Sequence, residues 1–174
     1  MRALIVSLLL MSLGLGDGLS HAAKADMARL LRDGPLARDY VNNLEWMRCS
    51  VGQVWESDTC AGEILMLSVP EAHEVVARIK SLEGGGWRLP TARELQSLVS
   101  KVENRPNDFD ANIDLETFPN TFAGPYWSSD QSFYTTRYQW SVNFFTGQSY
   151  NRFFPTQKIA VRLVRSFKIN SNSN

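Results

Sequence analysis

Histidine and cysteine are scarce in this chain of 174 residues, with two of each. The scarcity excludes most metal centres and most imidazole-based catalysis, because such sites gather several of these side chains. Neither charge dominates either, since 18 basic residues balance 18 acidic ones. A nucleic-acid-binding protein normally carries a basic excess, so we expect no nucleic-acid partner. We also expect no cofactor and no catalytic residues.

The first 25 residues have the pattern of an export signal. A positive start at Met1-Arg2 precedes an apolar run over residues 3–13, and small residues near positions 20–25 offer cleavage sites. The run is shorter than the roughly 20 residues that cross a bilayer, and no other segment approaches that length. We therefore expect an exported protein, periplasmic or extracellular, with no membrane span after cleavage.

The two cysteines, Cys49 and Cys60, follow this leader. An even cysteine count in an exported protein indicates a disulfide. A metal pair or a redox pair fits less well, because no histidine lies between them and the spacing differs from Cys-x-x-Cys. After loss of the leader, His73 is the last histidine, and no Gly-x-Ser-x-Gly turn accompanies it. We expect a structural disulfide and a solvated His73.

Two helices and several antiparallel strands are predicted. Ser68 begins a helix whose apolar residues recur at spacings of three and four. A capping box of Thr91 and Glu94 behind Pro90 begins a second helix. Beyond Phe109, short alternating runs between turns indicate strands. We expect an α+β fold in which the two helices pack on a small twisted antiparallel sheet, with one disulfide.

Several motifs occur together in one order. They are Trp87-Arg88-Leu89-Pro90-Thr91, Glu94-Leu95, Tyr126-Trp127-Ser128-Ser129, Trp140-x-Val142-x-Phe144 and Val161-Arg162-Leu163-Val164-Arg165. Together they resemble the Lcl C-terminal domain family, bacterial exported domains named for a collagen-like adhesin. The resemblance implies a C-type-lectin-like fold, related to formylglycine-generating enzymes, whose loops carry binding. It also implies adhesion to polysaccharide, but no collagen-like repeat is present here.

The resemblance, with the leader, divides the chain into four parts. These are a signal peptide (1–25), an N-terminal segment (26–42), the Lcl C-terminal-like domain (43–168) and a flexible tail (169–174). Two elements lie near the ends of the mature chain. A short helix is predicted at 26–32, and 159–165 alternates like a closing strand.

The motif residues have expected structural roles. Trp87 and Trp127 are large enough to anchor the helices on the sheet. Arg88 is expected to form a clamp with a carboxylate such as Asp114, and the serines after Trp127 are expected to satisfy loop backbone groups. The complete set of structural residues is Trp87, Arg88, Pro90, Thr91, Glu94, Asp114, Trp127, Trp140 and Arg162.

One segment offers oxygen ligands at alternate positions. They are Asp108, Asp110, Asn112 and Asp114. A calcium loop of the EF-hand type requires Gly at its sixth position and Glu at its twelfth, where this chain has Ile113 and Pro119. We therefore predict a solvated acidic loop and no metal site, with calcium as the weaker alternative.

No acidic residue follows Asp130, whereas several basic residues do. These are Arg137, Arg152, Lys158, Arg162, Arg165 and Lys168. Exposed basic and aromatic side chains together suit an anionic polysaccharide or an acidic protein. The alternative is that the aromatic residues form the core and the charges pair with residues 103–116. Our hypothesis is a binding face on exposed loops, made of Tyr134, Tyr138, Tyr150, Arg152 and Phe153.

These observations favour an exported, non-enzymatic binding domain that recognises a glycan or protein ligand at the cell envelope or surface, as an adhesin does. The alternative is a periplasmic immunity or inhibitor protein that blocks a toxin or an envelope enzyme. An enzyme like the formylglycine-generating group would need a reactive cysteine pair near a groove, and the two cysteines here are expected to be structural. The oligomeric state stays open.

Overall fold

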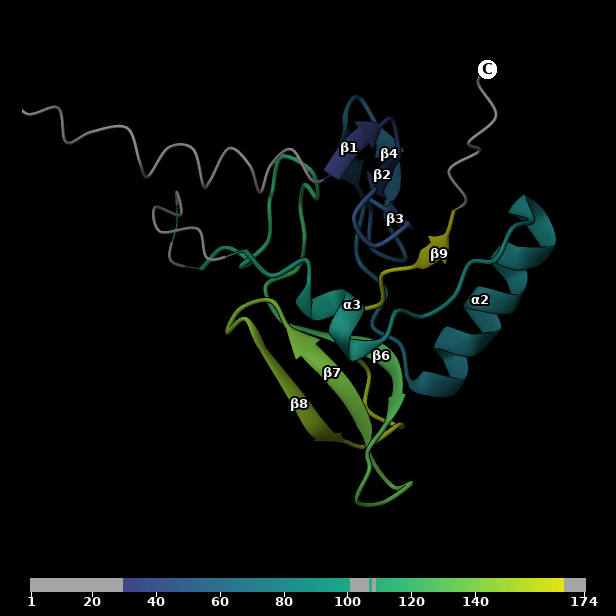
Figure 1. Cartoon of the computed structure of the whole chain (residues 1–174), viewed down its shortest axis with the longest axis vertical. Coiled ribbons are helices and arrows are strands. Elements are labelled where there is room, and N and C mark those ends of the chain that lie inside the picture. The colour runs from purple at the N-terminus through teal and green to yellow at the C-terminus, as the bar shows by residue number, and fades with distance from the viewer. Residues whose placement is uncertain (1–29, 101–106, 108, 168–174) are drawn as a thin grey trace, which may run out of the picture.

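The computed structural model describes residues 30–100, 107 and 109–167. The strands are β1 (Leu30–Asp33), β2 (Leu36–Asp39), β3 (Leu44–Met47), β4 (Val54–Glu56), β5 (Thr59–Ala61), β6 (Pro125–Gln131), β7 (Gln139–Asn143), β8 (Gln148–Phe153) and β9 (Val164–Ser166). The helices are α2 (Val69–Glu83) and α3 (Ala92–Gln96). Figure 1 shows their arrangement.

The described strands form three small antiparallel sheets. The first has the order β1-β2-β3-β9, the second is the hairpin β4-β5, and the third has the order β6-β7-β8. β9, from the end of the described chain, pairs with β3 near its beginning. In Figure 1 the third sheet lies apart from the first, with α3 against it and α2 to one side. The early and late segments therefore fold together.

The predicted α+β architecture, with two helices packed on one small twisted sheet, is wrong. The described residues are mostly β-structure in three sheets, and α3 has only 5 residues. Residues 30–32, predicted as helix, belong to β1, and only the end of the predicted strand 159–165 belongs to β9. Local patterns failed here because strands of three to five residues are identified by distant pairing rather than by their own periodicity.

Both helices begin at their predicted capping residues. The backbone N–H of Ser68 donates to the Glu71 carboxylate at 2.7 Å, and the Thr91 hydroxyl accepts from the Glu94 backbone N–H at 3.1 Å. The bonds from the Ser68 backbone and hydroxyl, and then one from Lys158, lower the pKa of Glu71 to about 2. Local capping chemistry therefore places both helix starts.

Two apolar clusters fill the interior. In the first, Trp46 of β3 and Leu95 of α3 meet Tyr126 of β6. In the second, residues of α2 pack against Trp87 and Trp127. The two tryptophans are 2% and 0% exposed, which confirms their predicted role as anchors.

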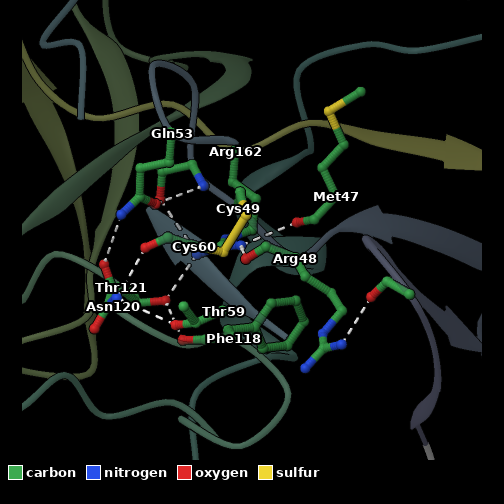
Figure 2. The surroundings of a disulfide bond; sticks show 12 residues. Met47, Arg48, Cys49, Gln53, Thr59, Cys60, Phe118, Asn120, Thr121 and Arg162 are labelled. Atoms are coloured by element: carbon green, nitrogen blue, oxygen red, sulfur yellow. Dashed lines mark hydrogen bonds between the residues drawn. A yellow bond between two sulfur atoms is a disulfide. The ribbon is translucent and has the colours of Figure 1, made fainter. Parts of the chain in front are cut away.

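The predicted disulfide between Cys49 and Cys60 is present. It joins the segment after β3 to β5, and Figure 2 shows the bond between the two cysteines. Cross-linking a short loop restricts the unfolded chain, so the bond stabilises the native state.

Arg162 is fully buried beside the disulfide and has no carboxylate partner among the described residues. Its guanidinium donates to the carbonyls of Met47 and Arg48 and to the hydroxyls of Ser50 and Thr121. It also lies over the Phe118 ring, 4.7 Å from the centroid. Burial lowers the pKa of Arg162, and this dense set of acceptors compensates the charged form for its lost hydration.

We predict that Arg162→Lys lowers the free energy of unfolding by at least about 2 kcal/mol, because one ammonium cannot reach all four acceptors. Urea denaturation measures the loss. Arg78→Lys, on the exposed face of α2, is the matched control and leaves stability unchanged. A difference below about 0.5 kcal/mol for Arg162→Lys would show that the guanidinium geometry is unimportant.

Replacing both cysteines by serine is expected to cost about 3 kcal/mol of unfolding free energy. A reducing agent should destabilise the wild type by a similar amount and leave the double variant unchanged. Equal stability of wild type with and without reductant would contradict a stabilising role for Cys49–Cys60.

Candidate binding surface

The loop between β6 and β7 carries two of the most exposed aromatic side chains in the described chain. Phe133 and Tyr134 are each 87% exposed. The loop is closed by its own hydrogen bonds, since the Ser132 backbone N–H donates to the Tyr138 carbonyl at 2.9 Å. In Figure 1 it projects from the end of the third sheet. Backbone hydrogen bonds therefore hold the shape of the β6–β7 loop. The rings of Phe133 and Tyr134 are not needed for it and remain exposed to solvent.

Two ring contacts connect this loop to the sheet. Phe133 meets Trp140 with centroids 6.1 Å apart, and Tyr138 meets Phe154 with centroids 4.9 Å apart. Tyr138 directly precedes β7 and Trp140 is its second residue, and the two side chains are half-buried on either side of the buried Gln139. We call Phe133, Tyr134, Tyr138, Trp140 and Phe154 the aromatic tip.

The structure divides the five residues of the predicted binding face. Tyr134 and Tyr138 belong to the aromatic tip. Tyr150 lies nearer the opposite end of β8, where its hydroxyl is 3.2 Å from a threonine hydroxyl in the β7–β8 turn. Phe153 turns inward and packs edge-on against Trp127, with centroids 6.0 Å apart. The hypothesis of one exposed face made of all five residues is therefore wrong for Phe153.

The division follows from the geometry of an edge strand. Side chains along β8 alternate between exposed and half-buried, with Arg152 exposed and Phe153 half-buried. The prediction placed Tyr150, Arg152 and Phe153 on exposed loops, and a loop has no such alternation. Phe133 and Phe154 were missed, although each directly adjoins a residue that was chosen.

Several of the basic residues beyond Asp130 already form ion pairs within the chain. Arg165 pairs with Glu45, and Lys158 pairs with Glu71 at 3.0 Å. Arg162 is buried, and Lys168 lies outside the described residues. Among the basic residues beyond Asp130, Arg137 and Arg152 are exposed and form no ion pair with a described residue. Arg137 lies between Tyr134 and Tyr138 in the sequence, and Arg152 lies between Trp140 and Phe154, so both add positive charge to the segment that carries the aromatic tip.

A cleft of about 550 Å³ opens on the first sheet. Its floor is the cross-strand row Arg38–Glu45–Arg165, and its wall includes Gly85 and Gly86. Burial alone would raise the pKa of Glu45, but hydrogen bonds from both arginines hold it below its ordinary value. The guanidinium groups of this cleft are therefore committed to a buried carboxylate.

The sequence pattern of the family described as Lcl C-terminal domain matches residues 36–165. The chain belongs to this family. The match begins at the first residue of β2, inside the segment 26–42 that the motifs alone leave outside the domain. The boundaries of this Lcl C-terminal domain thus include the strand that pairs with β3.

No curated protein and no solved structure gives a significant match to the chain. The C-type-lectin-like fold expected for this Lcl C-terminal domain is therefore not confirmed. None of the helices in the described ranges is long and apolar enough to span a membrane.

The Trp-Arg-Leu-Pro-Thr motif of the Lcl C-terminal domain forms a structural joint. Arg88 makes two bonds to the Glu94 carboxylate, at 2.7 and 2.8 Å. The expected partner Asp114 is instead bonded to the Thr117 hydroxyl at 2.5 Å. Glu94 lies only six residues after Arg88 in the sequence. Its capping box with Thr91 holds its carboxylate at the start of the helix, where Arg88 can reach it. The clamp exists, but the predicted partner was wrong.

Of the two serines that follow Trp127, the Ser128 side chain satisfies backbone groups, and Ser129 contributes its own backbone N–H. The Ser128 hydroxyl donates to the Trp140 carbonyl at 3.0 Å and accepts from the Asp130 backbone N–H at 3.2 Å. The Ser129 backbone N–H donates to the carbonyl of the buried Pro90 at 2.7 Å. The Ser128 bond to Trp140 therefore ties β6 to β7, and the Ser129 bond ties β6 to the segment before α3.

The predicted calcium residues hold their own loop together. Asp108 lies outside the described residues, and Asp110 has partners within the protein. The Asn112 amide donates to the Phe145 carbonyl at 2.6 Å, and Asp114 accepts from the Glu116 backbone N–H at 3.0 Å. Within the described ranges, no three His, Cys, Asp or Glu side chains gather around a possible metal position.

The Arg88–Glu94 pair should make the free energy of unfolding depend on pH in the acidic range. Burial alone would raise the pKa of Glu94, but bonds from Arg88 and from the Thr91 backbone hold it below the ordinary 4.5. Because the pKa of Glu94 is lower in the folded than in the unfolded state, its ionised form stabilises the fold at pH values above the unfolded pKa. This stabilisation is lost as the pH falls through the folded-state pKa. Glu94→Gln should therefore cost about 1 kcal/mol near neutral pH, allowing for solvent screening of the pair.

Urea denaturation at a series of pH values checks this expectation. The wild type should lose more stability than Glu94→Gln as pH falls below 4.5. Glu74→Gln, which removes an exposed carboxylate of α2, is the control and should retain the wild-type slope. Parallel curves for wild type and Glu94→Gln would contradict the assignment.

Proposed function

We propose that the protein is a non-enzymatic binding domain that works outside the cytoplasm and holds an acidic glycan with its aromatic tip. The observation that carries this proposal is the pair of rings, Phe133 and Tyr134, left 87% exposed on a loop that is already closed by hydrogen bonds. Large rigid rings on an ordered loop lose little conformational entropy on binding. Their faces suit the apolar faces of sugar rings.

Charge supports an acidic glycan over a neutral one. Arg137 and Arg152 are exposed and form no ion pair with the described residues. A guanidinium offers paired N–H groups that match the oxygens of carboxylate or sulfate. No acidic residue follows Asp130 in the sequence, so little nearby charge in this segment opposes such a ligand.

The location outside the cytoplasm rests on two independent features. Residues 1–25 have the pattern of an export signal, and the chain forms a disulfide between Cys49 and Cys60. Structural disulfides persist in oxidising compartments and are rare in the cytosol. The immunity or inhibitor role stays a prediction as the alternative function.

The test compares glycan binding by wild type and tip variants. We expect wild type to bind alginate and dextran sulfate more tightly than neutral dextran, with an affinity that falls as salt rises. Phe133→Ser with Tyr134→Ser should weaken binding about tenfold or more, and Arg152→Glu should weaken it and flatten the salt dependence. Affinity electrophoresis and calorimetry measure both effects.

Leu82→Ser is the matched control, because it removes another highly exposed apolar side chain (77%) far along α2. It should leave glycan affinity unchanged, and circular dichroism should show that all variants melt like wild type. Unchanged affinity in the double tip variant, or equal binding of neutral dextran, would refute the proposal.

A further inference from the structure

A groove of about 580 Å³ lies beside the disulfide, on a different part of the chain from the aromatic tip. It is lined by Gln53, Cys60, Ala61, Gly62, Glu63, Ile64, Met66, Asn120 and Phe122. Figure 2 shows Gln53, Asn120 and Cys60 close together in this region. Nothing in the proposed glycan site uses these residues.

The floor of the groove is rigid and its polar groups are already paired. The Asn120 amide donates to the Cys60 carbonyl at 2.8 Å, and the Gln53 amide donates to the Asn120 carbonyl at 3.2 Å. Gly52 lets the neighbouring loop approach closely, since an added Cβ would lie 2.5 Å from the Leu65 nitrogen. A floor held in this way is preorganised, which lowers the entropic cost of binding.

Two apolar side chains that line the groove, Phe122 and Met66, are partly exposed, and so are Val54, which pairs with the lining residue Ala61, and Leu65, which lies between the lining residues Ile64 and Met66. Val54 is 61% exposed, Leu65 51%, Phe122 37% and Met66 36%. Single exposed apolar residues are ordinary, but a group around one concavity marks a contact surface. Methionine adds an adaptable side chain to such a surface. The groove therefore has a largely apolar lining whose Gln53 and Asn120 amides are already hydrogen-bonded.

The exposed charges near the groove are acidic, whereas the nearby Arg48 is buried and its guanidinium donates to three backbone carbonyls. Between residues 49 and 77 the sequence has five acidic residues and no lysine or arginine. Glu56, Asp58 and Glu63 are exposed, and none forms an ion pair with a described residue. Glu63 itself lines the groove. The field of this surface attracts cations, whereas the aromatic tip carries exposed arginines.

We propose that this groove is a docking surface for a cationic protein, which inserts an apolar side chain flanked by lysines or arginines. The apolar lining supplies a pocket for the inserted side chain, and the surrounding carboxylates select the sign of the partner's charge. The proposal is independent of the glycan site, because the two surfaces share no residue and have opposite charge.

The experiment measures fluorescence anisotropy with two labelled peptides. One has a Leu-Trp pair flanked by three lysines on each side, and the other replaces that pair by two serines. The Leu-Trp peptide should bind wild type about tenfold more tightly than the serine peptide. Leu65→Ser with Met66→Ser, and separately Glu63→Lys, should each weaken its binding about tenfold.

Two controls are matched to these variants. Leu82→Ser removes an exposed leucine of α2, and Phe133→Ser removes a ring of the aromatic tip; both should bind the Leu-Trp peptide like wild type. Thermal melting of every variant shows that the fold is retained. Absence of binding up to about 1 mM, equal affinity for both peptides, or full affinity in Leu65→Ser with Met66→Ser would overturn the proposal.

Sedimentation of the protein alone distinguishes a second copy from a cationic partner. We expect a monomer across the accessible concentrations. Concentration-dependent dimers that disappear in Leu65→Ser with Met66→Ser would assign the groove to self-association and would also overturn the cationic partner.

Discussion

One buried guanidinium connects the parts of this protein that lie furthest apart in sequence. Arg162 comes from the segment before β9, yet its acceptors surround Cys49 on one side and include Thr121 on the other. Ser50, one of these acceptors, also shares a hydrogen bond with the Tyr126 hydroxyl of β6 at 2.9 Å. A buried charge with no counter-ion among the described residues requires nearly all of these bonds at once, so the surrounding segments form cooperatively.

The rigid centre explains why both candidate surfaces lie at the periphery. The disulfide and Asn120 hold the acidic groove against the centre, whereas the aromatic tip extends from the far end of the third sheet. Charges in the first sheet are committed to structure, as the Arg38–Glu45–Arg165 row shows. What remains for recognition is a basic, ring-bearing loop and an acidic, apolar groove. Opposite charge lets the two surfaces select different ligands.

Features that depend on neighbouring residues in the sequence could be predicted, whereas contacts between distant residues could not. The starts of α2 and α3 follow from residues within three positions of each cap, and the disulfide follows from cysteine count and the leader. The partner of Arg88 was misassigned because several carboxylates were available and only folding decides which is nearest. The inward position of Phe153 also required the sheet, since an edge strand and an exposed loop can share a composition.

The sequence by itself determined the family, the helix caps, the cysteine pairing and the charge segregation, because each depends on residue identity or on neighbours along the chain. Tertiary structure alone decided that the described strands form three sheets and that Arg162 is buried without a carboxylate partner among the described residues. It also decided which rings reach solvent. These outcomes depend on contacts between residues tens of positions apart, whose energies compete with one another and leave no periodic signal in the chain.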